Sequence, residues 1–124
     1  MGGTVRSLAP DLPIIEIVSY GTVSRHDADG MVELLAQECA RMGIWCVLDD
    51  STDMMHTLTP TDIVQITDGV VSLGVADHLR VAFVRPTDVA AAAWVDLWGT
   101  AAANRGLAMR VFRDRQDAVD WLLS

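Results

Sequence analysis

The sequence predicts an α/β fold: a small parallel or mixed β-sheet with alternating helices, in the order β-α-β-α-β-α-β-α. Short apolar segments rich in β-branched residues alternate with longer segments whose apolar residues recur at three- and four-residue steps. Each longer segment follows a residue typical of a helix start, and glycine stands near the end of three of them. Alternation of this kind is typical of a largely parallel sheet with helices packed on its faces.

The first unit is a strand over 14–20, followed by a helix that begins after Ser24. Ser24 is the expected N-cap, and Asp27 places a carboxylate near the positive end of the helix dipole. Gly43 stands where a helix end favours a left-handed residue. The expected apolar face of this helix consists of Ala28, Met31, Leu35, Cys39 and Met42.

The second unit is a buried strand over 44–49, then a loop, then a helix that begins at Pro60. Thr59 as N-cap, proline at the first helical position and the acidic Asp62 form a strong helix-start signal. Gly74 is expected near the end of this helix.

The last two units repeat the pattern. A strand over 79–84 precedes a helix over 88–104, and a strand over 108–112 precedes a terminal helix capped by Asp114. One face of the third helix carries Trp94, Trp98 and Ala102. Residues 1–13 are expected to form an irregular lead-in with room for a short edge strand, so the domain proper is placed at 14–124.

Composition limits the classes of protein. A chain of 124 residues is the usual size of one domain, and its hydrophobic fraction of 51% argues against disorder. The net charge is −8 and the sequence contains no lysine, which disfavours nucleic acids and anionic membrane surfaces as partners. No apolar run approaches the ~20 residues that span a bilayer, so neither membrane insertion nor a signal peptide is expected. These features predict a cytoplasmic protein.

The two cysteines fall on different predicted elements. Cys39 lies on the apolar face of the first helix, and Cys46 lies in the second strand. Both are expected to be free, buried thiols, because a disulfide is disfavoured in a reducing cytosol.

The second strand ends in a run of oxygen-bearing side chains, which is the most informative stretch of the chain. Asp49, Asp50, Ser51 and Asp53 follow one another closely at what is expected to be the carboxyl edge of the sheet, where ligands bind in open α/β folds. Oxygen clusters suit a hard cation, but Asp and Ser after a strand more often make local turn hydrogen bonds. We expect no metal and no cofactor. A hydrolase based on Ser51 and His56 is a further alternative, although no nucleophile elbow accompanies these residues.

These landmarks resemble the SpoIIAA-like proteins, within the wider STAS and SEC14-like families. The resemblance covers nearly the whole chain from Ile14 and rests on IIEIVSYGTVS, the strand that ends at Asp49, LRVAFV and NRGLAMRVFRDRQDAVDWLL. The last segment is the most specific, because its RG…RVF…A..WL spacing is shared by many members. The resemblance implies the SpoIIAA-like fold.

It also implies a function. STAS domains of the anti-sigma-factor-antagonist type act without catalysis, bind a kinase-like protein and are switched off by phosphorylation at a helix start. The corresponding position here is Thr59, so it is the candidate phosphoacceptor. Its surroundings differ from the family pattern, because Thr57-Leu58-Thr59-Pro60 replaces Asp-Ser-Ser-Gly. The alternative interpretation of Thr59 is a plain N-cap.

We therefore expect a non-catalytic regulatory or protein–protein interaction domain with a protein partner. Its surface is placed on the loop from Asp50 to Thr61 and the helix that follows. The candidate surface residues are Asp50, Ser51, Asp53, Met54, Met55, Leu58, Thr59 and Trp94. A homodimer through an exposed strand edge is also compatible with a mixed sheet of this size.

The alternative function is a carrier of a small apolar ligand or lipid, as in SEC14-like relatives. Its pocket would lie between the sheet and the helices, near Met54, Met55 and Trp94. A carrier requires an apolar cavity of about 300 Å³ or more.

Overall fold

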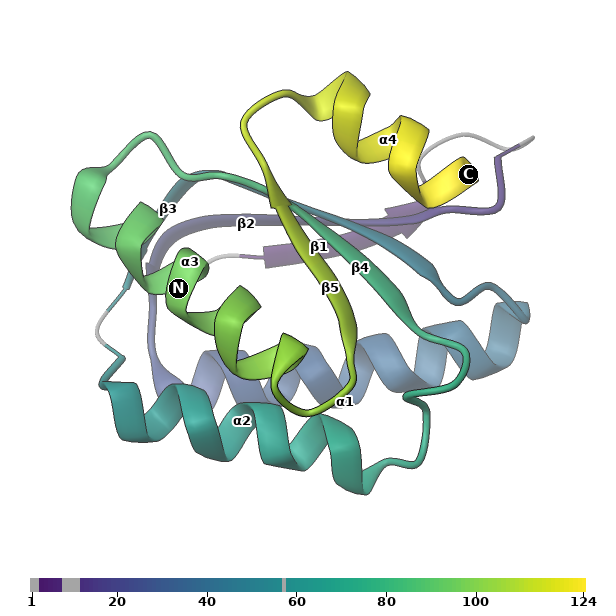
Figure 1. The fold of residues 1–124 in the computed structure, drawn as a ribbon, viewed down its shortest axis with the longest axis horizontal. Coiled ribbons are helices and arrows are strands. Elements are labelled where there is room, and N and C mark those ends of the chain that lie inside the picture. The colour runs from purple at the N-terminus through teal and green to yellow at the C-terminus, as the bar shows by residue number, and fades with distance from the viewer. Residues whose placement is uncertain (1–2, 8–11, 57) are drawn as a thin grey trace.

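The fold is a five-stranded mixed sheet covered by helices on both faces (Figure 1). The computed structural model describes residues 3–7, 12–56 and 58–124. The elements in chain order are β1 (Gly3–Ser7), β2 (Ile15–Val23), α1 (Arg25–Met42), β3 (Cys46–His56), α2 (Pro60–Ser72), β4 (Arg80–Val84), α3 (Val89–Ala103), β5 (Ala108–Phe112) and α4 (Arg115–Leu123). The predicted β-α alternation is confirmed.

The strands lie in the order β1-β2-β3-β4-β5. Strands β2 to β5 are mutually parallel, and β1 pairs antiparallel with β2. Residues 3–7, within the expected lead-in, form a short edge strand, for which the lead-in left room; positions 1–2 and 8–11 lie outside the described residues. Backbone hydrogen bonds with β2 hold β1 in its register. Such hydrogen bonds form without an alternating apolar pattern in the side chains.

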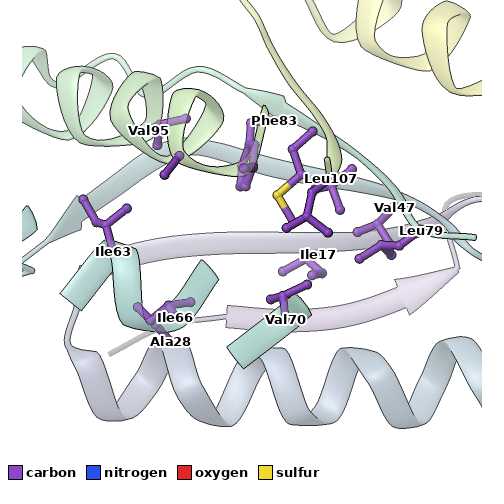
Figure 2. Close-up of a cluster of buried hydrophobic side chains, with 14 of the residues drawn as sticks. Ile17, Ala28, Val47, Ile63, Ile66, Val70, Leu79, Phe83, Val95 and Leu107 are labelled. Atoms are coloured by element: carbon purple, nitrogen blue, oxygen red, sulfur yellow. The ribbon is translucent and has the colours of Figure 1, made fainter. Parts of the chain in front are cut away.

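The sheet has one thick and one thin covering layer. Figure 1 shows α1, α2 and α3 on one side of the sheet and α4 on the other. The larger apolar core lies on the three-helix side, where Ile17, Val47 and Phe83 of the sheet meet helical residues such as Ile66 and Val95 (Figure 2). The smaller core lies under α4 and consists of Ile14, Leu48, Ala82, Val84, Ala118 and Leu122.

The helix boundaries follow the capping signals. Ser24 and Thr59 are N-caps with complete capping boxes, and Asp114 caps α4. Gly43 ends α1 in the left-handed region at φ +66°, which glycine adopts without steric cost. These predictions are confirmed.

Strands β2 and β3 continue together beyond the rest of the sheet. Residues 20–23 of β2 pair with 53–56 of β3, whereas β4 stops opposite Asp50 and the described pairing of β1 reaches Ser19. We call this two-stranded extension the ribbon. A register shift precedes it, because the single residue Ser19 of β2 lies opposite two residues of β3. The loop expected from Asp50 onward is therefore strand as far as His56, since pairing with β2 outweighs the turn preference of the polar residues.

Candidate functional site

The inner face of β3 carries a buried carboxyl group, that of Asp49. Its side chain lies on the three-helix side of the sheet and only 9% of the residue is exposed. Its Oδ1 accepts hydrogen bonds from the Ser51 hydroxyl at 2.9 Å and the Ser19 hydroxyl at 3.2 Å. Burial raises the pKa of Asp49 to about 6; the two serine hydroxyls oppose this rise and the charge of Asp50 adds to it. Asp49 therefore titrates close to neutral pH.

Asp49 faces a cavity between the sheet and the three helices. The cavity has a volume of about 80 Å³ and is lined mostly by apolar side chains. Three of its aromatic lining residues pack together: Trp98 lies 5.3 Å from Phe83 and 4.9 Å from Trp94 between ring centroids. The indole N–H of Trp98 is buried and has no hydrogen-bond partner among the described residues. The polar groups that line the cavity are thus not all hydrogen-bonded to other described residues.

On the α1 side, the cavity is covered largely by side chains that are only partly buried. Of the 18 residues of α1, the fully buried ones are Ala28 and Cys39. Met31, Val32 and Leu35 line the cavity but are only partly buried. Burial raises the pKa of the Cys39 thiol to about 11, so Cys39 is an inert core residue as predicted.

The neighbouring carboxylates lie on the opposite face of the sheet. Asp50 receives hydrogen bonds from Arg115 at 3.1 Å and from the Thr52 hydroxyl at 2.6 Å. Arg115 also forms an ion pair with the buried Glu16. Because successive side chains of a strand point to opposite faces, the predicted oxygen cluster is divided by the sheet. Within the described ranges, no group of three His, Cys, Asp or Glu side chains is placed to hold a metal ion.

The outer face of the ribbon presents two large apolar side chains to solvent. Tyr20 and Met55 are each 45% exposed. Tyr20 pairs with Asp53, and Met55 lies two residues beyond Asp53 on the same strand, so the three side chains share one face. Asp53 is exposed as well. We call Tyr20, Asp53 and Met55 the ribbon patch.

The start of α2 lies where the ribbon ends. The Thr59 Oγ1 accepts the backbone N–H of Asp62 at 3.1 Å, and the Asp62 carboxylate accepts the N–H of Thr59 at 2.9 Å. Arg25, at the start of α1, donates to Asp62 at 3.3 Å and to Gln65 at 2.6 Å. The two helix starts are thereby joined. Hydrogen bonds from the backbone N–H of Thr59 and from the Arg25 guanidinium lower the pKa of Asp62. Asp62 therefore stays ionised near neutral pH.

Replacing Thr59 with alanine is expected to lower the free energy of unfolding by about 1 kcal/mol, because the N–H of Asp62 loses its acceptor. Urea denaturation monitored by circular dichroism measures this change. Thr59→Ser keeps the hydroxyl and serves as the matched control. Equal stability of the alanine and wild-type proteins would contradict the capping role.

The structure separates the predicted surface residues into two groups. Asp50, Asp53, Met55 and Thr59 reach solvent at least in part. Ser51, Met54, Leu58 and Trp94 are buried, so they are not available to a partner on the surface. Met55 is exposed and Met54 is buried, because adjacent residues of a strand face opposite ways.

The hydrolase alternative receives no support from the placement of Ser51. Its side chain is buried, and its hydroxyl donates to Asp49. The side chain of His56 lies outside the described residues.

Two residues of the site, Ser19 and Tyr20, were not predicted from the sequence. Ser19 is a polar residue inside an otherwise apolar strand, which is a usable sign of a buried polar contact. Tyr20 gave no such signal, because its exposure depends on how far β2 extends beyond β1.

Comparison with solved structures places the fold. The chain has a TM-score of 0.60 with an uncharacterised protein of the DUF3478 family from Shewanella loihica PV-4, described as having a SpoIIAA-like fold; the two are 23% identical over 98% of this chain and 94% of that one. It also matches the anti-sigma factor antagonist SpoIIAA in its unphosphorylated form, with a TM-score of 0.61, 8% identity, and coverage of 99% of each chain. The phosphorylated form of SpoIIAA, a Bacillus cell fate determinant, gives 0.56 at 7% identity over 98% of this chain and 99% of that one.

The chain therefore has the SpoIIAA-like α/β fold, as predicted. No family model and no curated protein matches the sequence. At these identities the likeness establishes the fold and not the function, which depends on the site.

The carrier hypothesis is not supported by the interior. The cavity of about 80 Å³ is well below the ~300 Å³ that a lipid carrier requires. Among the helices that the structure describes, none has the length and apolarity to cross a membrane.

Proposed function

We propose that this protein is a non-catalytic regulatory domain that binds a protein partner through the ribbon patch and the start of α2. The SpoIIAA-like fold supports this proposal, since one solved structure with the same fold is an anti-sigma factor antagonist. The exposed positions of the predicted surface, Asp53, Met55 and Thr59, all lie in this region.

The observation that carries the proposal is the exposure of Tyr20 and Met55 on one face of a protruding ribbon. Tyrosine and methionine are enriched at protein interfaces, because each offers a large contact area, and methionine adapts to varied surfaces. Asp53 adds a negative charge beside them, and the whole chain carries −8. The partner surface that fits is an apolar patch flanked by arginine or lysine.

A phosphate on Thr59 is the proposed means of regulation. Thr59 is exposed at a helix N-terminus, where backbone N–H groups and the helix dipole favour an anion. Arg25 is close by, because it donates a hydrogen bond to Asp62, the partner of Thr59 in the capping box. Added negative charge there would repel the Asp62 carboxylate and alter the edge of the binding surface. Intact-mass spectra of protein recovered from its native host test this point: a phosphate that is absent from Thr59→Val supports the switch, and uniformly unmodified protein contradicts it.

Partner binding is expected to weaken at least tenfold in Met55→Asp and in Tyr20→Asp, because each change places a charge at the centre of the ribbon patch. The measurement is a quantitative pulldown with the wild-type protein as bait, followed by titration of the recovered partner against each variant. Leu34→Asp is the matched control, since Leu34 is similarly exposed but lies on α1. Its binding should equal that of the wild type.

Thermal unfolding separates lost binding from lost folding. Both ribbon variants should unfold within a few degrees of the wild-type protein, because the substituted side chains are exposed. A partner that binds the ribbon variants as tightly as wild type would contradict this surface.

A further inference from the structure

The cavity contains an acid, Asp49, for which the described lining residues supply no cation. Among its described lining residues, the charged side chains are Asp27 and Asp49. Asp27 is engaged in the capping box of α1, where its carboxylate accepts the N–H of Ser24 at 3.0 Å. The ion pairs of the described residues all involve other carboxylates. Among the described residues, none forms an ion pair with Asp49.

One oxygen of Asp49 is left available. The two serine hydroxyls both donate to Oδ1. In the part of the chain that the structure describes, no donor reaches Oδ2. Burying an ionisable group without a full set of partners is costly, and proteins retain such groups chiefly where a ligand or reaction uses them.

The remaining wall of the cavity suits an organic cation. The faces of tryptophan and phenylalanine attract a cation through the ring quadrupole, and Phe83, Trp94 and Trp98 all line the cavity. The rest of the lining is almost entirely apolar. No described lining residue is basic, so an anion such as a carboxylate or phosphate would be repelled by Asp49 without a cationic side chain to offset the repulsion.

The size of the cavity limits the ligand. Its volume of about 80 Å³ is roughly half that of an apolar cavity of about 150 Å³ that binds benzene. On that scale this space accepts about three non-hydrogen atoms as it stands, so a ligand of about five requires Met31 and Leu35 of α1 to move outward. Lipids and sterols are therefore excluded as whole molecules.

We propose that this cavity binds a small primary amine, whose ammonium group meets Oδ2 of Asp49 and whose short carbon chain lies against Phe83, Trp94 and Trp98. The partly buried side chains of Met31 and Leu35 on α1 provide the route of entry by a small displacement. This site is internal and separate from the ribbon patch, so it stands independently of the proposed partner binding.

The test is a titration of the full-length protein with n-butylammonium chloride at pH 7.5, against sodium chloride at equal ionic strength. Two-dimensional NMR follows the indole N–H signals of Trp94 and Trp98, which line the cavity. Saturable shifts of these signals are expected. Butyrate, which has a similar size and the opposite charge, is expected to cause none.

Asp49→Asn is the decisive variant, because asparagine preserves the shape and an acceptor for the two serines but removes the charge. Its affinity for butylamine is expected to fall at least tenfold. Asp53→Asn is the matched control, since Asp53 lies on the same strand outside the cavity, and its affinity should not change. Absence of saturable binding to the wild type would overturn the proposal. Equal binding of butylamine by Asp49→Asn, or equal binding of 1-butanol and butylamine by the wild type, would overturn it too.

The pH profile gives an independent readout. Affinity should be constant above pH 7 and fall about tenfold per pH unit below about 6, as Asp49 takes up a proton. The other charged groups nearby are Asp50 on the opposite face of β3 and Asp27 on α1; the N–H of Ser24 lowers the pKa of Asp27, so it stays ionised in this range. An affinity that is flat from pH 7.5 to 5 would contradict recognition by Asp49.

Discussion

Replacing Asp49 with asparagine is expected to stabilise the folded protein at pH 7 by about 3 kcal/mol. Burial raises the pKa of Asp49 from 3.8 to about 6. Each pKa unit corresponds to about 1.4 kcal/mol of differential interaction between the two protonation states. At pH 7 the wild-type protein holds an ionised carboxylate in a largely apolar cavity, and the neutral amide avoids this cost while still accepting from Ser19 and Ser51.

The same shift sets the sign of the pH dependence. A carboxyl group whose pKa is higher in the folded than in the unfolded state binds more protons when folded, so its stabilising effect is complete below about pH 4 and is lost as the pH rises through about 6. The wild-type protein should therefore lose more stability than Asp49→Asn between pH 5 and pH 7. Urea denaturation of both proteins at both pH values gives the change in unfolding free energy of each between pH 5 and pH 7. Subtracting one change from the other isolates the contribution of Asp49 from that of the other carboxylates.

Asp53→Asn is the control for general effects of removing a negative charge, because Asp53 is exposed on the same strand. It should change stability by no more than about 0.5 kcal/mol. An Asp49→Asn protein that is less stable than wild type at pH 7, with an unchanged pH profile, would show that the carboxylate contributes to the fold and is not a cost to it.

This result bears on the amine site as well. A variant that folds more stably and yet fails to bind butylamine cannot have lost binding through misfolding. Functional groups commonly reduce stability, because the arrangement that suits a ligand is not the one that suits the empty fold. Asp49 combines burial, a raised pKa and a cavity, which together are typical of a functional position.

The order of the elements was predictable because two local signals agree. Hydrophobic periodicity separates strands from helices, and the caps Ser24, Thr59 and Asp114 fix the helix starts to the residue. Strand ends carry no comparable signal. β3 runs seven residues past the expected end at Asp49 because β2 continues beside it, and this is a property of the pair of strands.

The site was only partly predictable for the same reason. The alternation of a strand implies that Asp49 and Asp50 face opposite sides, but which side holds three helices and a cavity depends on the whole topology. The contact between Ser19 and Asp49 requires the β2–β3 register, which no short-range pattern specifies. The exposure of Met55 beside a buried Met54 likewise follows from the ribbon.

Replacing Leu48 with alanine is expected to lower the free energy of unfolding by about 2–5 kcal/mol. Leu48 is fully buried in the smaller core, where Ala118 and Leu122 of α4 pack against the sheet. Alanine removes this buried apolar surface and leaves a cavity beneath α4, a helix of nine residues. Urea denaturation at pH 7 should show a lower midpoint with an unchanged slope.

Two control variants identify the cause. Leu34→Ala removes the same atoms from an exposed position on α1 and should cost no more than about 0.5 kcal/mol. Leu48→Met keeps most of the volume and should cost less than about 1.5 kcal/mol. If Leu48→Ala were as mild as Leu34→Ala, α4 would not seal this face of the sheet. Leu48 and Asp49 are adjacent in β3 and face opposite sides of the sheet. Leu48→Ala is expected to lower stability because Leu48 packs under α4, whereas Asp49→Asn is expected to raise it because Asp49 places a charge in the cavity on the three-helix side.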